Sequence, residues 1–186
     1  MESRHGTNGH EHIAPTSVVV MGVTGCGKST VGALLAARID LPFIDGDELH
    51  SEANKQKMAA GIPLDDADRA PWLGLIATAL AWAPMVVACS ALKRSYRDRL
   101  RAGAPDVRFL YLAGAPTLLG LRLSARSHEF MPPSLLESQL AILEPPGSDE
   151  NALTLDIQVS AEAIVDSAAV WLRRRAGAAS KDPGHK

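Results

Sequence analysis

A glycine-rich segment at residues 22–29 has the spacing of a phosphate-binding loop. Its sequence, G-V-T-G-C-G-K-S, fits the pattern G-x-x-x-x-G-K-[ST] between an apolar β-branched run and a helical stretch. Glycines let backbone N–H groups turn inward toward phosphate oxygens, and the following helix directs its positive dipole end at the same anion. The motif predicts that ATP is bound by consecutive residues: Gly22, Val23, Thr24, Gly25, Cys26, Gly27, Lys28, Ser29 and Thr30.

The side chains of this loop have separate expected roles. Lys28 can neutralise charge on the β- and γ-phosphates, and the Ser29 hydroxyl can ligate the Mg²⁺ ion that accompanies ATP. Thr30 can donate a further hydrogen bond to the α-phosphate, whereas Cys26 is expected to contribute its backbone N–H rather than its thiol. Such a loop indicates only that a nucleoside triphosphate is bound, so any acceptor must be recognised elsewhere in the chain.

A pair of acids lies at the end of the second predicted strand: Asp45 is its last residue, and Asp47 is two residues on. Many phosphate-loop proteins place a metal-binding aspartate at the end of another buried strand, but residues 88–90, after the third predicted strand, contain no acid. Loops at the carboxyl ends of parallel strands face one crevice. We therefore predict that Asp45 supports the Mg²⁺ water shell and that Asp47 binds or deprotonates the acceptor hydroxyl, with the reverse assignment left open. The competing interpretation is a simple Asp-Gly-Asp turn.

Short apolar runs alternate with helical stretches along the chain. Predicted strands lie at residues 17–21, 43–45, 85–88, 108–112 and 153–157. Predicted helices lie at residues 28–39, 48–60, 70–82, 93–101, 116–127, 133–143 and 161–173. This alternation implies right-handed βαβ units and hence a three-layer α/β fold, in which a five-stranded parallel sheet has helices on both faces. The prediction is one domain over residues 16–175 between flexible tails at 1–15 and 176–186.

Composition excludes several other classes of protein. The 186 residues carry a formal net charge of −2, so there is no basic excess for binding a nucleic-acid backbone. Apolar runs stop well short of the roughly 20 residues that span a bilayer, and the polar N-terminus does not have the apolar core of a signal peptide. Two isolated cysteines, Cys26 and Cys89, are too few for a disulfide framework or a four-ligand zinc site. We expect a cytoplasmic protein with no nucleic-acid or membrane partner.

Motifs beyond the phosphate loop resemble the gluconokinase family. The resemblance extends over most of the span from residue 18 to residue 171, and Ser51 stands where family members commonly carry proline. The motifs that carry it are D-G-D-E-L-H at 45–50, D-R at 68–69, P-W-L at 71–73, C-S-A-L-K-R at 89–94, F-M-P at 130–132, S-Q at 138–139 and L-E-P at 143–145.

This resemblance implies an activity as well as a fold. It implies a P-loop kinase fold with a small mobile lid, often as a homodimer, that uses ATP and Mg²⁺ to phosphorylate D-gluconate at its 6-hydroxyl. The product, 6-phospho-D-gluconate, would feed the pentose phosphate and Entner–Doudoroff routes. Two alternatives remain at this stage: another P-loop small-molecule kinase, such as a shikimate kinase, or a nucleotide-dependent switch module without an acceptor pocket.

Gluconate is a polyol with one carboxylate, so its site needs a cation at one end and hydrogen-bonding groups along the chain. Arg69 is the candidate for a bidentate bond to the carboxylate. Further residues are expected to line the same crevice: His50, Ser90, Lys93 and Arg97. The remaining arginines of the predicted helix at 93–101 are interpreted as a solvated face: Arg94, Arg99 and Arg101.

Two arginines are candidates for a lid. Arg122 and Arg126 are four residues apart on a predicted helix and therefore share one face, which could close over the phosphates. A closing arginine would stabilise the charge that spreads over the transferred phosphoryl group, and residues 130–133 have the composition of a hinged cap that excludes water. The tryptophans are predicted to pack in the core rather than stack on adenine, since each falls on an apolar helix face: Trp72, Trp82 and Trp171.

Overall fold

The computed structural model describes residues 16–125 and 133–176. Its five strands are parallel and form one sheet in the order β2-β3-β1-β4-β5. The strand bounds are β1 Val18–Met21, β2 Phe43–Asp45, β3 Val86–Ala88, β4 Arg108–Ala113 and β5 Ala152–Asp156. The predicted five-stranded parallel sheet is confirmed, with strand ends that differ from the prediction by at most one residue.

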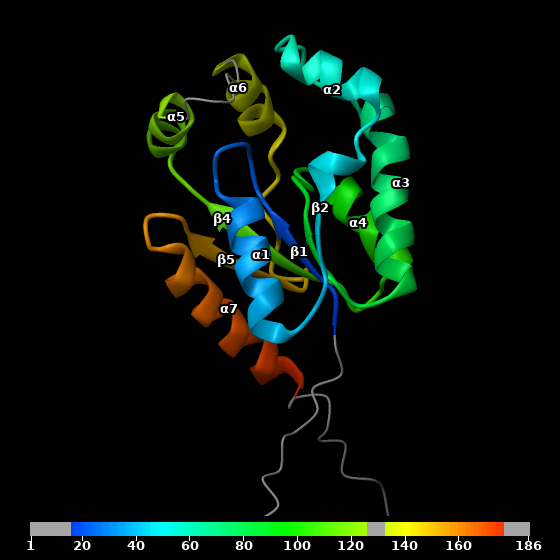
Figure 1. Cartoon of the computed structure of the whole chain (residues 1–186), viewed down its shortest axis with the longest axis vertical. Coiled ribbons are helices and arrows are strands. Elements are labelled where there is room, and N and C mark those ends of the chain that lie inside the picture. Colours follow the sequence, from blue (N-terminus) through cyan, green and yellow to red (C-terminus); the bar gives the residue numbers. More distant parts are fainter. Residues whose placement is uncertain (1–15, 126–132, 177–186) are drawn as a thin grey trace, which may run out of the picture.

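Helices cover both faces of this sheet. Their bounds are α1 Lys28–Ile39, η1 Gly46–Leu49 (a 3₁₀ helix), α2 Glu52–Ala59, α3 Asp66–Trp82, α4 Arg94–Gly103, α5 Pro116–Ser124, α6 Pro133–Ile142 and α7 Ala161–Ala176. Figure 1 shows α1 and α7 together on one face, and α3 and α4 together on the other. The helices α2, α5 and α6 lie above the end of the sheet that carries the phosphate loop (Figure 1). The fold is therefore the three-layer α/β arrangement predicted from the sequence.

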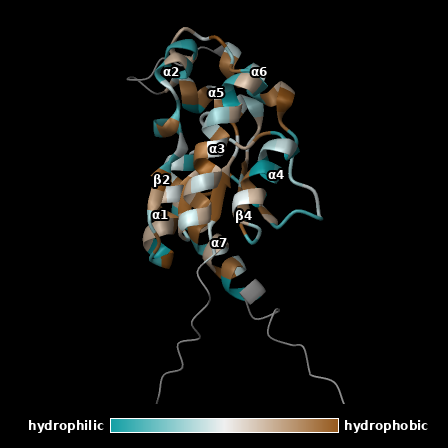
Figure 2. Cartoon of the chain, turned by 90° about the vertical axis from the view of Figure 1, so that its right-hand side faces the viewer, coloured by the Kyte–Doolittle hydropathy of each residue, from teal (hydrophilic) through white to brown (hydrophobic). Residues whose placement is uncertain are grey.

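The core consists of two apolar layers, one on each side of the sheet. In β1, Val18 and Val20 pack with α1 and α7, whereas Val19 and Met21 pack with α3 and α4. Both pairs are fully buried, which explains why this strand is a continuous apolar run rather than an alternating one. Figure 2 shows the hydrophobic colouring concentrated on the central strands, with hydrophilic residues on the outer turns of the helices.

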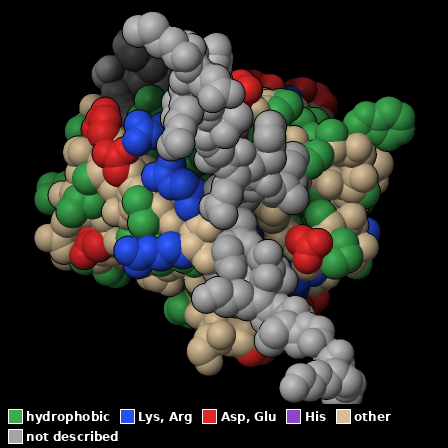
Figure 3. Space-filling model, turned by 90° about the horizontal axis from the view of Figure 1, so that it is seen from below, with side chains coloured by type: hydrophobic (Ala, Val, Ile, Leu, Met, Phe, Trp, Pro, Cys, Tyr) green, Lys and Arg blue, Asp and Glu red, His purple; other side chains and the backbone are tan. Residues whose placement is uncertain are grey.

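The strand order places β1 at the point where the connections change direction. Its neighbours are β3 on one side and β4 on the other, so the loop after β1 opens into the crevice where ligands of parallel sheets bind. The chain enters β1 and leaves α7 at the opposite end of the sheet (Figure 1). On the visible part of that opposite end, basic side chains lie close to acidic ones (Figure 3).

Two helices, α2 and α3, begin about four residues away from their predicted starts because polar caps determine where they begin. The single helix expected at 48–60 is divided into η1 and α2, since Ser51 is extended and its hydroxyl accepts the N–H of Asn54 at 3.2 Å. Helix α3 begins before the predicted residue 70. Asp65 and Asp68 form a reciprocal capping box there, and Pro71 lies inside the helix instead of in its first turn.

The prediction that all three tryptophans pack in the core is wrong for Trp82, whose side chain is 90% exposed. The buried residues of α3 follow the face of Trp72, Ile76 and Leu80, and Trp82 falls on the opposite face with Leu75.

None of the described helices is both long and apolar enough to cross a membrane. The predicted tails fall outside the described residues, except that Ala176 is the last residue of α7.

Candidate functional site

The phosphate loop connects β1 to α1 and is braced from both sides of β1. Gly22 has φ +142°, and a Cβ at this residue would lie 2.9 Å from the Leu112 carbonyl oxygen of β4, so only glycine fits. The Gly22 N–H donates to the Ser90 carbonyl oxygen at 3.3 Å, on the other side. The first residue of the loop is therefore confined between β4 on one side and the segment that follows β3 on the other.

The functional side chains of the loop lie at the start of α1. The Lys28 ammonium donates to the Val23 carbonyl oxygen at 3.1 Å and thereby spans the loop from end to beginning. Ser29 and Thr30 are exposed in the first turn of α1, while Cys26 is buried beneath the loop, 1% exposed. These positions agree with the predicted phosphate cradle, and the individual contacts with ATP stay predictions.

A glutamine of α6 contacts the phosphate loop directly. The backbone N–H of Thr24 donates to Oε1 of Gln139 at 2.7 Å, across 115 positions of sequence. Gln139 also lines the cavity beside the loop. Sequence reasoning assigned no role to Gln139, because nothing local signals so distant a contact. The Ser138–Gln139 motif was its only sequence signal.

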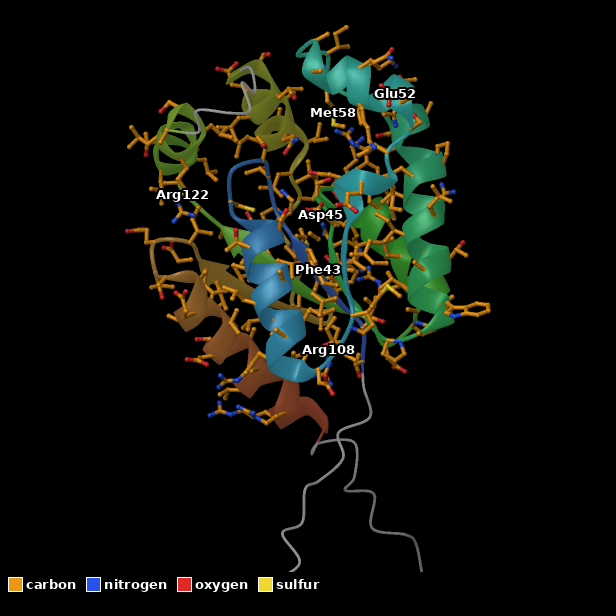
Figure 4. The ribbon with its side chains drawn as sticks, in the orientation of Figure 1. Phe43, Asp45, Glu52, Met58, Arg108 and Arg122 are labelled. Atoms are coloured by element: carbon orange, nitrogen blue, oxygen red, sulfur yellow. The ribbon has the colours of Figure 1, made fainter. Side chains whose placement is uncertain are left out.

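The acid pair lies on a tightly clamped turn between β2 and η1. Asp45 is paired with Ala88 of β3, and its Oδ1 accepts the Asp47 N–H at 3.0 Å. A Cβ on Gly46 would lie 2.4 Å from the Ala88 carbonyl oxygen, so the turn sits directly on β3. The Trp72 indole N–H donates to the Gly46 carbonyl oxygen at 2.6 Å. Figure 4 shows Asp45 at the upper end of β2, close to the phosphate-loop end of α1.

The two acids therefore have different positions. Asp47 lines the cavity beside the phosphate loop, whereas Asp45 caps η1. This capping role is the simple-turn interpretation for Asp45, and its expected part in the Mg²⁺ water shell stays a prediction. Asp47 combines a position in the turn with access to the cavity, as expected of a residue that engages the acceptor.

The cavity beside the loop has a volume of about 50 Å³ and brings together most of the predicted acceptor-site residues. It is lined by Thr24, Lys28, Asp47, His50, Met58, Pro63, Leu64, Arg69, Ser90, Leu135, Ser138 and Gln139. The lining comes from the phosphate loop, the acid turn, the α2–α3 region, the segment after β3, and α6. In Figure 4 Met58 lies on α2, the element that faces α6 across the top of this region.

His50 is held in a defined orientation next to the acids. Its ring stacks on Trp72 with centroids 4.2 Å apart and an angle of 15° between the planes, and its Nδ1 lies 3.4 Å from the Asn54 amide nitrogen. Burial lowers the pKa of His50, and this effect outweighs the opposing charge of Asp47. The imidazole is therefore favoured in its neutral form, which can both accept and donate hydrogen bonds to a polyol.

Arg69 separates this inner cavity from a larger outer one. Arg69 is 7% exposed, and its guanidinium donates to the Leu64 carbonyl oxygen and lies over the Tyr96 ring, 5.8 Å from the ring centroid. The outer cavity, about 480 Å³, has Arg69, Pro63, Leu64 and Ser138 in common with the inner cavity. The two cavities are therefore adjacent, and the buried Arg69 belongs to the lining of both.

Lys93 lies in the outer cavity, not the inner one. Its ammonium is 2.8 Å from Oδ1 of Asp66 and lies over the Tyr96 ring. The hydrogen bond from Lys93, followed by one from Tyr96, lowers the pKa of Asp66. A ligand anion that reached Lys93 would therefore compete with Asp66 for it.

The prediction that Arg97 binds substrate is wrong. Its side chain is 1% exposed and forms an ion pair with Glu150, with Nε to Oε2 at 2.7 Å and Nη2 to Oε1 at 2.8 Å. Burial by itself raises the pKa of Glu150, but hydrogen bonds from Arg97 and Arg101 outweigh it and lower the pKa to about 2. The helix at 93–101 was expected to be exposed, but a buried partner 53 positions away makes a buried arginine tolerable.

Of the two predicted lid arginines, Arg122 lies among the described residues, and it lines neither the inner nor the outer cavity. Arg122 is a residue of α5 that is turned to the loop after β5, where its Nη2 donates to the Ile157 carbonyl oxygen at 2.6 Å. Figure 4 shows it well away from Asp45. Its expected action on the phosphates stays a prediction. Arg126 and most of the predicted cap at 130–133 lie outside the described residues.

Comparison with known proteins shows similarity along most of the chain. The shikimate kinase family model matches residues 24–144. The gluconokinase of Gluconobacter oxydans (strain 621H) is 44% identical over 159 residues, 83% of this chain and 89% of that protein. The probable gluconokinase of Mus musculus is 43% identical over 169 residues, 79% of this chain and 92% of that protein. The crystal structure of a gluconokinase from Sinorhizobium meliloti 1021 has 47% identity and a TM-score of 0.82, covering 88% of this chain and 94% of its own.

Proposed function

This chain belongs to the gluconokinase family, and on that premise we propose that its cavity binds D-gluconate beside ATP on the phosphate loop. The protein is a kinase that phosphorylates gluconate, and the product expected from the 6-hydroxyl is 6-phospho-D-gluconate. One observation carries the assignment: Lys28 and Asp47 line the same cavity as His50 and Arg69. A triphosphate-binding group, an acid and a polyol-binding set are thus adjacent.

The sizes and positions of the two cavities support one orientation of the bound acceptor. A pocket of about 50 Å³ is smaller than the roughly 300 Å³ or more that small-molecule sites usually offer, so the inner cavity holds only the reacting end. The rest of the six-carbon acid extends past Arg69 into the outer cavity. Its carboxylate then lies at Arg69 and Lys93, while the terminal hydroxyl lies at Asp47.

In this arrangement Asp47 accepts the proton of the terminal hydroxyl as its oxygen attacks the γ-phosphorus of ATP. The new O–P bond forms while the bond between the γ-phosphorus and the β,γ-bridging oxygen breaks, and ADP leaves. Lys28 neutralises the charge that develops on the leaving β-phosphate oxygen, and inward N–H groups of the loop hold the phosphates.

The donor set fits Mg²⁺. The Ser29 hydroxyl is exposed at the start of α1 and the Asp45 carboxylate is an oxygen donor, which is the ligand type that Mg²⁺ prefers. Within residues 16–125 and 133–176, no three or more Asp, Glu, His or Cys side chains are grouped so that they could hold a metal ion by themselves. In this proposal phosphate oxygens and water complete the shell. Bound Mg²⁺ would supply charge neutralisation across the β- and γ-phosphates.

The alternatives are less well supported. A switch module needs no acceptor cavity, whereas this chain places one beside the phosphate loop. The shikimate kinase model match covers residues 24–144, but gluconokinases are similar over a larger share of the chain and at 43–47% identity.

Turnover with a panel of acceptors tests the proposal. We expect ADP to form in a one-to-one ratio with a compound heavier than gluconate by one phosphoryl group, detected by mass spectrometry. Shikimate, nucleoside monophosphates and acceptor-free samples are the controls and should release little ADP. The proposal fails if gluconate gives no product, or if shikimate or a nucleotide reacts faster.

Replacing Arg69 with methionine should specifically remove recognition of the carboxylate. Methionine keeps much of the apolar length but cannot form the two charge-assisted bonds, so we expect KM for gluconate to rise by about 10–100-fold. KM for ATP should change little. The sharpest measurement is the preference for gluconate over the matching uncharged alditol, which should collapse in the variant.

Exposed Arg99 provides the matched control, and Arg99→Met should retain the preference. An Arg69→Met enzyme that still discriminates gluconate from the alditol as wild type does would show that the carboxylate binds elsewhere.

We propose the cytoplasm as the working location, in keeping with Cys26 and Cys89, which are buried free thiols. A homodimer remains a prediction of the family resemblance. The net charge of −2 gives no support to a nucleic-acid partner.

A further inference from the structure

The turn between β3 and α4, residues 89–93, contacts both halves of the site. The Ser90 carbonyl oxygen accepts the N–H of Gly22, the first residue of the phosphate loop, and Ser90 also lines the acceptor cavity. The next residue, Ala91, has φ +43°, a left-handed conformation that a non-glycine residue adopts at an energetic cost. Something outside the turn must therefore hold it in this shape.

Arg97 supplies that hold from one turn along α4. Its Nη1 donates to the carbonyl oxygens of Ala91 at 3.0 Å and Leu92 at 3.2 Å. Its Nε and Nη2 both donate to the Glu150 carboxylate, and this two-point contact orients the guanidinium plane toward the turn. Glu150 is fixed in turn by the N–H of Gly147 at 3.1 Å and by Arg101 at 2.9 Å.

The same turn is joined to the chain that leaves α6. The Leu92 carbonyl oxygen also accepts the N–H of Glu144 at 2.9 Å, two residues beyond the end of α6. Helix α6 carries Gln139, whose amide oxygen binds the Thr24 N–H of the phosphate loop. The phosphate loop is thus contacted at Gly22 by the turn and at Thr24 by α6. Arg97 binds the turn directly, and the turn also binds Glu144, just after α6.

Stability alone does not account for a charged pair in this place. Replacing a buried ion pair with apolar residues of similar volume is often neutral or stabilising. Apolar residues could fill the space between α4 and residues 147–150, but they could not donate to the Ala91 and Leu92 carbonyl oxygens. The specific contribution of the ion pair is therefore to hold the β3–α4 turn in its conformation.

We propose that the buried Arg97–Glu150 pair is a positioning element for phosphoryl transfer, which fixes the β3–α4 turn so that Ser90 holds Gly22 and faces the acceptor. This rests on the proposed function for its turnover readout, but not for its effect on the nucleotide. Arg97 lines neither the inner nor the outer cavity. It acts through Ser90, and a misplacement of reacting groups by about 1 Å is enough to reduce turnover about 100-fold.

The double variant Arg97→Met/Glu150→Met separates positioning from stability. We expect it to fold with a midpoint in urea close to that of wild type, because no charge is left unpaired. Its kcat should fall about 10–100-fold, and its affinity for a non-hydrolysable ATP analogue, measured by titration, should fall several-fold. Arg97→Lys should show the same loss of turnover, since an ammonium group cannot hold Glu150 and both carbonyl oxygens at once.

The Arg94–Asp149 pair is the matched control. It joins the same two segments at 2.6 Å, but both side chains are at least 50% exposed. Arg94→Ala/Asp149→Ala should leave kcat and nucleotide affinity unchanged. The proposal would be overturned if the folded double variant kept the kcat and nucleotide affinity of wild type. If the double variant does not fold, the same result in Arg97→Lys would overturn it. An inactive wild-type enzyme would instead count against gluconate phosphorylation, and the nucleotide titration would still decide the positioning role.

Discussion

Replacing Asp47 with asparagine should lower kcat for gluconate by about 10²–10⁴-fold, the usual contribution of a positioned general base. Asparagine has nearly the same shape, and the backbone N–H that donates to Asp45 is retained, so the turn should keep its conformation. The amide cannot accept the proton of the attacking hydroxyl. KM for ATP should stay within a few-fold of wild type, because the phosphate loop is untouched. Steady-state kinetics with a coupled ADP assay measures both.

Asp45→Asn is the matched control, since it changes the other acid of the same turn. Asp45 caps η1 and does not line the cavity, so its loss should raise the Mg²⁺ concentration needed for half-maximal rate more than it lowers kcat at saturating Mg²⁺. The opposite pattern, with turnover lost in Asp45→Asn and kept in Asp47→Asn, would reverse the two roles. Normal turnover in Asp47→Asn alone would remove Asp47 from the mechanism.

The strands and the phosphate loop were predictable because their signals are local. A run such as Val18–Met21 is buried on both faces, and a continuous apolar run is what such a strand requires. The spacing of Gly22, Gly27 and Lys28 encodes a backbone conformation within eight residues. The acid turn was also local, although only the fold shows that Asp47 lines the cavity while Asp45 caps a helix.

The errors in the predicted site share a different cause, which is contact over long sequence distances. Arg97 lies in a charged helix among exposed arginines, so its local sequence gives no sign of burial. It is buried because the chain near Glu150 packs against α4 and supplies an ion-pair partner. Gln139 could not be assigned, because its partner Thr24 is 115 positions away. Trp82 shows the complementary limit: its neighbours in sequence are apolar, but the helical period places it on the solvent face of α3.

The site depends on where these distant segments meet. The Gly46 carbonyl oxygen is held by Trp72 of α3, and the Ser90 carbonyl oxygen holds Gly22 of the phosphate loop. The acceptor residues are therefore positioned by α3 and the turn before α4, on one face of the sheet, whereas Lys28 begins α1 on the other. The chemistry occurs at the carboxyl ends of the strands because that is where the two helical layers can both reach one ligand.

Lys28 should be the most sensitive position on the nucleotide side. Lys28→Met keeps an unbranched side chain of similar length in the first turn of α1, so the helix should remain intact. The substitution removes the positive charge expected to stabilise the β- and γ-phosphate oxygens. That charge is needed as the bond between the γ-phosphorus and the β,γ-bridging oxygen breaks. We expect kcat/KM for ATP to fall by about 10³-fold, the upper range for loss of one preorganised electrostatic donor. Steady-state kinetics at saturating gluconate provides the measurement.

The size of this effect follows from the position of the ammonium group, and a second lysine tests that point. Lys55 donates to the Glu48 carbonyl oxygen at the surface and does not line the cavity, so Lys55→Met removes the same net charge without touching the loop. Its kcat/KM should stay within a few-fold of wild type at ionic strengths that screen surface charge. Equal losses in the two variants would mean that Lys28 acts only through the overall charge of the protein. A small loss in Lys28→Met would mean that the Val23 carbonyl oxygen, its partner at 3.1 Å, keeps this ammonium away from the phosphates during turnover.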